Sequence, residues 1–304
     1  MLKYLVFVFT FNTLGRLPLP VLYGLMSFMA WVAYYVVRGA RRNIEQNLRH
    51  VMPKGAKESE VRRTAQRILE NVAFYYADLA RLPRMDIDDF FRRRLVYKGV
   101  EEHLRPAIRE GKGVIMLTSH FGNPEMAMQG LIPLGIPAFA VTEPLHPRLS
   151  KFLDEVRGSK GHEFAPVNVG SVKKIMRKLK EGDGIVALMG DRDIKGPKML
   201  LPFCGVETMM PTGPIEVALR AGAVVIPAFS MRRSRYVMVA EAEERLKLER
   251  TGDMASDVRA GALEYLERYE RRLRADPGQW AVLEAIWDTP VAGGGTRTGL
   301  GGGS

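Results

Sequence analysis

The sequence predicts an α/β fold in which a central, mostly parallel sheet is flanked by helices and preceded by an N-terminal helical, membrane-associating segment. Two patterns predict it. Short apolar runs alternate with amphipathic helical stretches in the later part of the chain, and an uncharged apolar stretch followed by arginines lies near its start. We divide the chain into a membrane-associating segment (1–40), a helical region (41–99), an α/β region (100–289) and a flexible tail (290–304).

The composition is that of a globular protein with excess positive charge. Of its 304 residues, 46% are hydrophobic and 26% are charged, which suits one large α/β domain with an appendage. The single cysteine, Cys204, excludes an intramolecular disulfide and cysteine-rich zinc modules, and a cytoplasmic location suits it. The net charge of +11 indicates a polyanionic partner, which charge alone leaves open among nucleic acid, anionic lipid and a phosphorylated cofactor.

The position of the positive charge favours a membrane. From Leu17 to Val37 no residue is charged, and an arginine cluster (Arg38 to Arg42) follows at once. The run approaches the roughly 20 residues that cross a bilayer. Two prolines and a glycine interrupt its first part, so it fits a spanning helix, a helix lying in the interface, or a buried soluble helix. By the positive-inside tendency, the arginines lie on the cytoplasmic side.

Two helices are expected between residues 41 and 82. A helical apolar repeat runs to Val51, Pro53 and Gly55 interrupt it, and a second repeat runs from Val61 to Leu82. The second helix places an apolar stripe on one face, and we expect this stripe to be buried. Its members are Ile68, Leu69, Val72, Ala73, Tyr76, Leu79 and Ala80.

Four short apolar runs predict the strands of the sheet. They lie at 113–119, 138–142, 184–189 and 224–229. Amphipathic stretches between and after them predict helices at 124–134, 147–156, 171–181, 213–221 and 257–275. Strands that alternate with helices in this way indicate a parallel sheet covered on both faces.

His120 ends the first of these strands. Asn123 is a favoured N-cap and Pro124 fits a first helical position, so the strand turns sharply into a helix. Open α/β sheets bind ligands at this carboxyl edge, and a new helix N-terminus offers free amides to an oxyanion. Glu125 can fold back to the imidazole, fix its tautomer and make it a general base. The alternative is a capping or core histidine.

The segment HFGNPE, residues 120–125, resembles the H-x4-[DE] motif of the lysophospholipid acyltransferase superfamily. It is most similar to the lipid A biosynthesis lauroyl acyltransferase branch, which includes the mycobacterial phosphatidylinositol mannoside acyltransferases. Further blocks follow in the family's order: VTEPL at 141–145, LDEVRGSKG at 153–161, LMGDRDIKG at 188–196, LPFCGVETMMPTGP at 201–214 and PGQW at 277–280. The likeness covers residues 20–288.

The resemblance implies a membrane-associated acyltransferase at the cytoplasmic face of the bacterial inner membrane. It would transfer a fatty acyl chain from acyl-CoA or acyl carrier protein to a hydroxyl of a glycolipid or phospholipid. No metal or resident cofactor is expected, and no nucleic acid partner. A glycerolipid acyltransferase of the lysophosphatidic acid type is an alternative, although the N-H-x-S sequence is missing. A nonenzymatic basic membrane-binding protein is another, which leaves the ordered blocks unexplained.

The resemblance also assigns roles to site residues. His120 would be the base and Glu125 the motif acid. Asp191 matches a position that is glutamate in the mannoside branch and is proposed there to pair with the histidine, so either carboxylate or both would orient the imidazole. The mannoside branch usually has aspartate at the position of Glu125, so the two acids exchange chain lengths. The remaining candidates, assigned to substrate binding, are Glu143, Arg157, Arg192, Asp193, Asn123 and Gly122.

Two of these candidates have further expected roles. The Arg157 guanidinium, if buried, would suit a phosphate or pair with Glu143. Gly122 is expected to permit a tight turn and a close approach of substrate.

Overall fold

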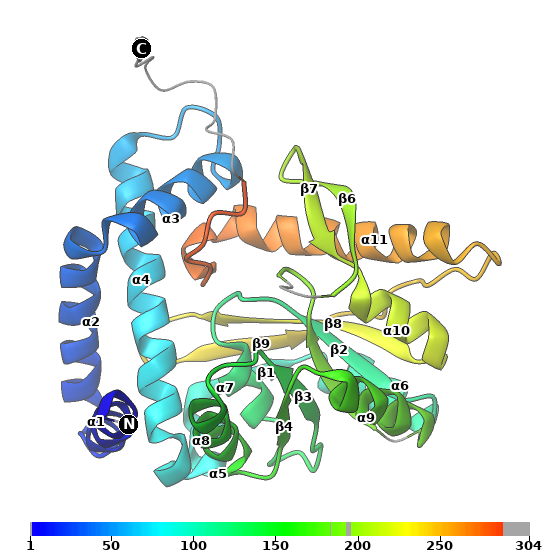
Figure 1. Cartoon of the computed structure of the whole chain (residues 1–304), viewed down its shortest axis with the longest axis horizontal. Coiled ribbons are helices and arrows are strands. Elements are labelled where there is room, and N and C mark those ends of the chain that lie inside the picture. Colours follow the sequence, from blue (N-terminus) through cyan, green and yellow to red (C-terminus); the bar gives the residue numbers. More distant parts are fainter. Residues whose placement is uncertain (1, 183, 193–195, 288–304) are drawn as a thin grey trace, which may run out of the picture.

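A seven-stranded sheet occupies the centre of the molecule, and helices cover both of its faces (Figure 1). The computed structural model describes residues 2–182, 184–192 and 196–287, and the tail predicted at 290–304 lies outside them. The strand order is β1-β9-β8-β2-β5-β3-β4. Every neighbouring pair is parallel except β8 and β9, which are antiparallel. The predicted α/β class with a mostly parallel sheet is confirmed.

The four predicted strands are β2, β3, β5 and β8. The sheet consists of β1 (Leu95–Lys98), β2 (Val114–Thr118), β3 (Phe139–Thr142), β4 (Glu163–Pro166), β5 (Ile185–Met189), β8 (Val224–Arg232) and β9 (Met238–Ala242). Strand β1 lies in the range 41–99 that the sequence predicts as helical. A separate antiparallel hairpin is formed by β6 (Lys198–Phe203) and β7 (Val206–Pro211).

Strand β2 lies at the centre of the sheet and is buried on both sides. Ile115 and Leu117 pack in a core with α9, α10 and α11, whereas Val114 and Met116 pack in a second core with α6 and α7. This double coverage explains the unbroken apolar run. The covering helices are α5 (Ile87–Arg94), α6 (Arg105–Arg109), α7 (Pro124–Gln129), α8 (Pro147–Gly158), α9 (Val169–Lys180), α10 (Gly213–Ala221) and α11 (Met254–Ala275), with the short helical turns η1 (Leu82–Arg84), η2 (Val100–Leu104) and η3 (Pro277–Gln279).

Four helices at the start of the chain form a layer at the left of Figure 1. They are α1 (Leu2–Leu14), α2 (Leu19–Val36), α3 (Arg38–Val51) and α4 (Glu58–Arg81). Helix α2 runs beside α4 and buries Leu22 and Tyr23 against Phe74 and Ala77. The stripe predicted on α4 is wrong at Tyr76, which is 52% exposed, because this side of the helix faces charged residues of the candidate site instead of another apolar element.

The predicted apolar segment forms α2. Among the described residues, Leu19–Val36 is the one helix that is long and apolar enough to cross a membrane, with a mean hydropathy of 1.5 and 22% of its residues buried. Its outward face and that of α1 carry large apolar side chains. The exposed ones are Leu5, Val6, Phe7, Phe9, Val21, Leu25, Phe28, Met29, Trp31, Tyr35 and Val36.

Candidate active site

The register of two central strands brings His120 and Asp191 together. Strand β2 pairs with β5 so that Thr118 lies opposite Met189, and the two site residues each stand two positions further along. Nδ1 of His120 lies 3.0 Å from Oδ1 of Asp191, and the His120 backbone amide donates to Oδ2 at 2.9 Å. The Asp191 side chain is 2% exposed and that of His120 is 32% exposed, so a buried carboxylate holds an accessible imidazole.

Two tyrosines of α11 that the sequence pattern does not single out support this pair. The Tyr269 hydroxyl donates to Oδ2 of Asp191 at 3.1 Å, and the Tyr265 hydroxyl donates to the carbonyl of Thr118 at 2.7 Å. Gly190 makes room for this packing, because a Cβ there would lie 2.6 Å from the Tyr265 ring. Their spacing of four residues predicts one shared helix face but not which strand ends it covers.

The two members of the pair shift each other's pKa in opposite directions. Burial is the largest effect on His120 and opposes its protonation, but the charge and hydrogen bond of Asp191 outweigh it, so the pKa of His120 is raised. Burial likewise opposes ionisation of Asp191, but the charge and hydrogen bonds of His120 outweigh it and lower the pKa of Asp191. The arrangement therefore stabilises an imidazolium opposite a carboxylate.

Glu125 does not reach the imidazole, which corrects the expectation from its place in the motif. Its Oε1 accepts a hydrogen bond from Nε of Arg157 at 2.9 Å, and Asp154 lies 3.7 Å from the same guanidinium. The Glu125 and Arg157 side chains are 15% and 13% exposed. Since α7 begins at Pro124, its first turn presents Glu125 to α8, which carries Arg157. Arg157 thus pairs with Glu125 and not with Glu143.

Arg192 links three segments beside His120. Its Nη2 atom lies 3.2 Å from Oε1 of Glu284 and 3.9 Å from Oε2 of Glu143. The charges of Arg192 and Glu284 both act on the pKa of His120, the first lowering it and the second raising it. Arg192 is 27% exposed and Glu143 50%, so both remain accessible from solvent. The predicted candidate Asp193 lies outside the described residues.

Gly122 and Asn123 support the loop after β2. Gly122 adopts φ +68°, and a Cβ there would lie 2.3 Å from the Ser230 carbonyl oxygen, so the backbone of β8 occupies the space expected for substrate. Asn123 is 1% exposed and its Oδ1 caps α7 by accepting the Met126 amide at 3.1 Å, as the sequence predicts. Its Nδ2 donates to Asp78 at 3.2 Å.

Three backbone amides of the loop after β2 already donate hydrogen bonds and are not available to an oxyanion, whereas the oxyanion site expected at the N-terminus of α7 stays a prediction. His120 donates to Asp191, Phe121 to the carbonyl of Ser119 at 2.7 Å, and Gly122 to the carbonyl of Gln279 at 2.8 Å.

Helix α7 ends at Gln129, short of the predicted 134. Within the described ranges, no group of three or more His, Cys, Asp or Glu side chains is placed to hold a metal ion.

Known proteins are similar to this chain over most of its length. The chain is similar to the phosphatidylinositol mannoside acyltransferase of Mycobacterium tuberculosis, with 26% identity over 269 residues that cover 86% of this chain and 81% of the relative. It is equally similar to the same enzyme of Mycolicibacterium smegmatis, with 26% identity over 267 residues covering 86% and 84%. A sequence model of the bacterial lipid A biosynthesis acyltransferases matches residues 1–289. The resemblance found in the sequence is confirmed, and the chain belongs to the bacterial lipid A biosynthesis acyltransferase family.

Proposed function

We propose that this acyltransferase moves a fatty acyl chain from an acyl thioester to a glycolipid hydroxyl, with His120 as the general base. The observation that carries the proposal is the pair of His120 and Asp191, in which a buried carboxylate fixes Nδ1 of an accessible imidazole. The pair lies at the carboxyl edge of the sheet, where α/β proteins bind their ligands. An acid on Nδ1 leaves Nε2 free to accept a proton.

The proposed reaction proceeds by addition and elimination. The acceptor hydroxyl gives its proton to Nε2 of His120 as its oxygen attacks the thioester carbonyl carbon. Asp191 stabilises the imidazolium that forms, and Tyr269 holds Asp191 in place. When the tetrahedral intermediate collapses, the carbon–sulfur bond breaks and the leaving sulfur takes the proton from the imidazolium. The thioester is already activated, so the proposed reaction needs neither a metal nor a resident cofactor.

We assign to the Arg192 side chain the role of binding negative charge on the substrate. It stands next to Asp191 in the chain and its charge acts on the imidazole, so a cation is available near the reacting carbonyl. Glu143 and Glu284 would hold this guanidinium until an anionic group of the substrate competes for it. Asp193 remains a proposed substrate-binding position beside Arg192.

The relatives support a glycolipid acceptor. Both are named as acting on phosphatidylinositol mannosides, so we propose a lipid of this kind, or another membrane glycolipid, as the acceptor. Acyl-CoA and acyl carrier protein are the two proposed donors. The enzyme would work at the cytoplasmic face of the inner membrane, with Arg38, Arg41 and Arg42 towards anionic headgroups and no nucleic acid partner.

Helix α2 would lie in the membrane interface and not cross the bilayer. One side of it is packed along α4, a helix that exposes Glu58 and Arg67 to solvent. A helix with these charges does not fit in the hydrocarbon core. If α2 spanned the bilayer, it would draw α4 in with it, whereas a surface-lying α2 buries only its outward face in lipid.

The test uses purified protein in lipid nanodiscs. Labelled palmitoyl-CoA or palmitoyl carrier protein is added with phosphatidylinositol mannosides, with lysophosphatidic acid or with the host's total lipid extract, and products are followed by lipid mass spectrometry. An acylated glycolipid made by wild type and lost in His120→Ala is the expected result. Full transfer by His120→Ala would refute the general base, and transfer to lysophosphatidic acid alone would replace the glycolipid acceptor.

A further inference from the structure

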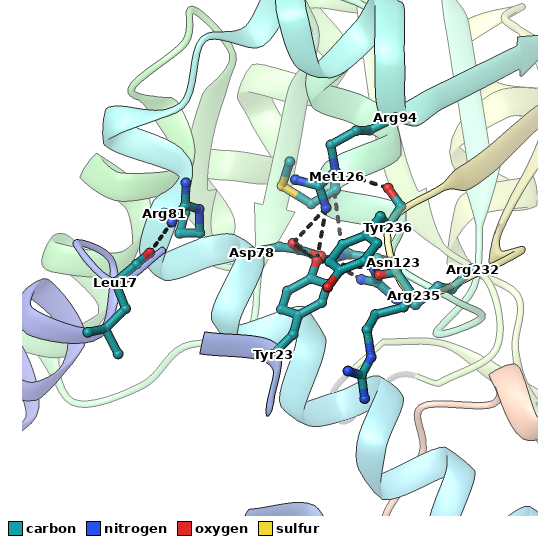
Figure 2. Close-up of polar contacts among 10 residues, drawn as sticks. All are labelled: Leu17, Tyr23, Asp78, Arg81, Arg94, Asn123, Met126, Arg232, Arg235 and Tyr236. Carbon is teal, nitrogen blue, oxygen red and sulfur yellow. Dashed lines mark hydrogen bonds and ion pairs between the residues drawn. The ribbon is translucent and has the colours of Figure 1, made fainter. Parts of the chain in front are cut away.

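Asp78 lies at the centre of a buried polar cluster that reaches from the apolar helix α2 to the loop after His120 (Figure 2). The Tyr23 hydroxyl of α2 donates to Oδ1 of Asp78. Nη2 of Arg232, on β8, lies 2.5 Å from Oδ2, and Nδ2 of Asn123 donates to the same oxygen at 3.2 Å. Tyr23 and Asp78 are 0% exposed and Asn123 is 1% exposed. Three separate elements therefore share one carboxylate.

Two guanidinium groups face this carboxylate. Arg94 lies 3.9 Å from Oδ1 of Asp78, donates to the Tyr23 hydroxyl at 3.1 Å and donates to the Tyr236 carbonyl at 2.9 Å. Arg232 also donates to the Tyr23 hydroxyl, at 3.2 Å. Buried charges are costly unless each is paired and hydrogen-bonded, so few arrangements of these side chains are tolerated. The cluster fixes the position of α2 relative to the sheet more narrowly than apolar packing would.

The cluster is part of a closed ring of hydrogen bonds around the loop after His120. The side chain of Gln279 accepts the backbone amide of Arg232 at 2.9 Å and donates to its carbonyl at 3.0 Å. The Gln279 carbonyl accepts the amide of Gly122 at 2.8 Å. The side-chain amide of Asn123, the next residue, donates to Asp78, and Asp78 in turn accepts from Arg232, which closes the ring. The ring thus holds the chain two and three residues after His120.

We propose that Asp78 is a positioning residue for acyl transfer. Through Asn123 it fixes the loop that sets the position of His120, and through Tyr23 it makes α2 part of the support of the active site. The inference rests on the proposed function, since acyl transfer is its main readout. It follows that displacing α2 lowers the turnover of bound substrate as well as the contact with lipid. Misplacement of a catalytic group by about 1 Å can cost roughly a hundredfold in rate.

Two substitutions each remove one hydrogen bond to Asp78, and Tyr23→Phe also removes the hydroxyl oxygen that accepts from Arg94 and Arg232. Tyr23→Phe removes the hydroxyl donor of α2. Asn123→Ser removes the amide donor but keeps an oxygen that caps α7. The matched control is Tyr34→Phe, on the same helix, which removes the hydroxyl of a buried tyrosine that donates to the partly buried Glu45 at 2.7 Å, away from Asp78. Steady-state transfer is measured in nanodiscs, and amide hydrogen exchange is followed across residues 120–126.

We expect kcat to fall roughly 3- to 10-fold in Tyr23→Phe and about 10- to 100-fold in Asn123→Ser, with the KM for the acyl donor within about twofold of wild type. Because both bonds end on one carboxylate, the double variant should be less impaired than the product of the single effects. Exchange across 120–126 should be faster in both variants and unchanged in Tyr34→Phe.

A purely structural cluster gives a different result. It would lower the melting temperature of both variants while kcat per folded enzyme and exchange across 120–126 stayed at wild-type values, and this overturns the proposal. Independent, multiplicative effects on kcat overturn the link through Asp78. If wild-type protein transfers no acyl chain to any acceptor, the proposed function fails instead, and the exchange measurement alone then decides whether α2 supports the loop.

Discussion

Asp191 contacts His120 at two points, since its Oδ1 lies 3.0 Å from Nδ1 and its Oδ2 accepts the backbone amide at 2.9 Å. Asp191→Asn keeps the shape of the side chain but removes the charge that stabilises the imidazolium and favours the wrong tautomer. We expect kcat to fall about 10²- to 10⁴-fold in the nanodisc assay. Tyr269→Phe removes only one hydrogen bond to Asp191 and should cost about tenfold or less. A kcat for Asp191→Asn within threefold of wild type would refute the assigned role.

The pH dependence of the reaction should report the same pair. Burial disfavours the imidazolium, but Asp191 outweighs it and raises the pKa of His120 above its ordinary value of 6.5. A general base acts only when neutral, so kcat/KM should rise with pH through a pKa above 6.5. In Asp191→Asn the raising charge is gone, so the acidic limb of the residual activity should move to lower pH.

Glu125→Gln is the control for this shift. Glu125 is paired with Arg157, so neutralising Glu125 should lower the stability of the protein. The acidic limb of the pH profile of kcat/KM should stay where it is. A limb that moves as far in Glu125→Gln as in Asp191→Asn would show that the motif acid governs the base. The two profiles are measured in the same buffers with one acyl donor.

Strands β2, β3, β5 and β8 of the sheet could be predicted from sequence, but the edge strands β1 and β4 and the short strand β9 could not. Strands β2, β5 and β8 are covered on both faces, which requires unbroken apolar runs that are visible in the sequence. At the edges, β4 reads EFAP and β1 reads LVYK, and each is only four residues long. Such short strands with polar residues carry too little periodicity to be separated from loops.

The place of His120 at a strand end could be predicted, but which of the two candidate acids faces it could not. His120 was identifiable because a strand, a cap and a helix follow one another within a few residues. The choice between Glu125 and Asp191 depends on β5 lying beside β2, and Asp191 is 71 residues from His120 in the chain. Strand order and register decide this contact, and the local sequence pattern predicts neither of them. The same holds for Asp78, whose partners come from α2, β8 and the loop before α7.

His162 should make stability depend on pH below neutrality. The imidazole is 4% exposed, accepts the Ala138 amide at 3.0 Å and donates to the Met128 carbonyl at 2.7 Å, so it is neutral in the folded protein. Burial lowers its pKa to about 4. Between about pH 6.5 and 4 the unfolded chain binds a proton that the folded chain does not, so stability is lost as pH falls through this window.

The size of the effect follows from the shift. A difference of about 2.5 pKa units corresponds to roughly 3 kcal/mol of the free energy of unfolding. This contribution of His162 should be almost fully lost near pH 4, and it should change little at lower pH. The free energy of unfolding is measured from pH 4 to 7 for wild type and for His162→Gln. Other titrating groups contribute to both proteins, so the difference between the two curves isolates His162. Parallel curves would contradict a neutral, buried His162.

The outward face of α2 should determine binding to lipid. Phe28 and Trp31 are 58% and 54% exposed on this face, and replacing both by Asp places two charges where the interface is apolar. We expect vesicle binding in flotation assays with phosphatidylglycerol-rich liposomes to fall at least about tenfold. The control carries Leu200→Asp and Met209→Asp, two equally exposed apolar positions on the β6–β7 hairpin, which lies far from α2 in Figure 1. Equal loss of binding in the control would assign the effect to general surface charge, and unchanged binding in the α2 variant would exclude this face as the anchor.

An interfacial α2 also predicts that alkaline carbonate releases wild-type protein from membranes, whereas a spanning helix would resist extraction.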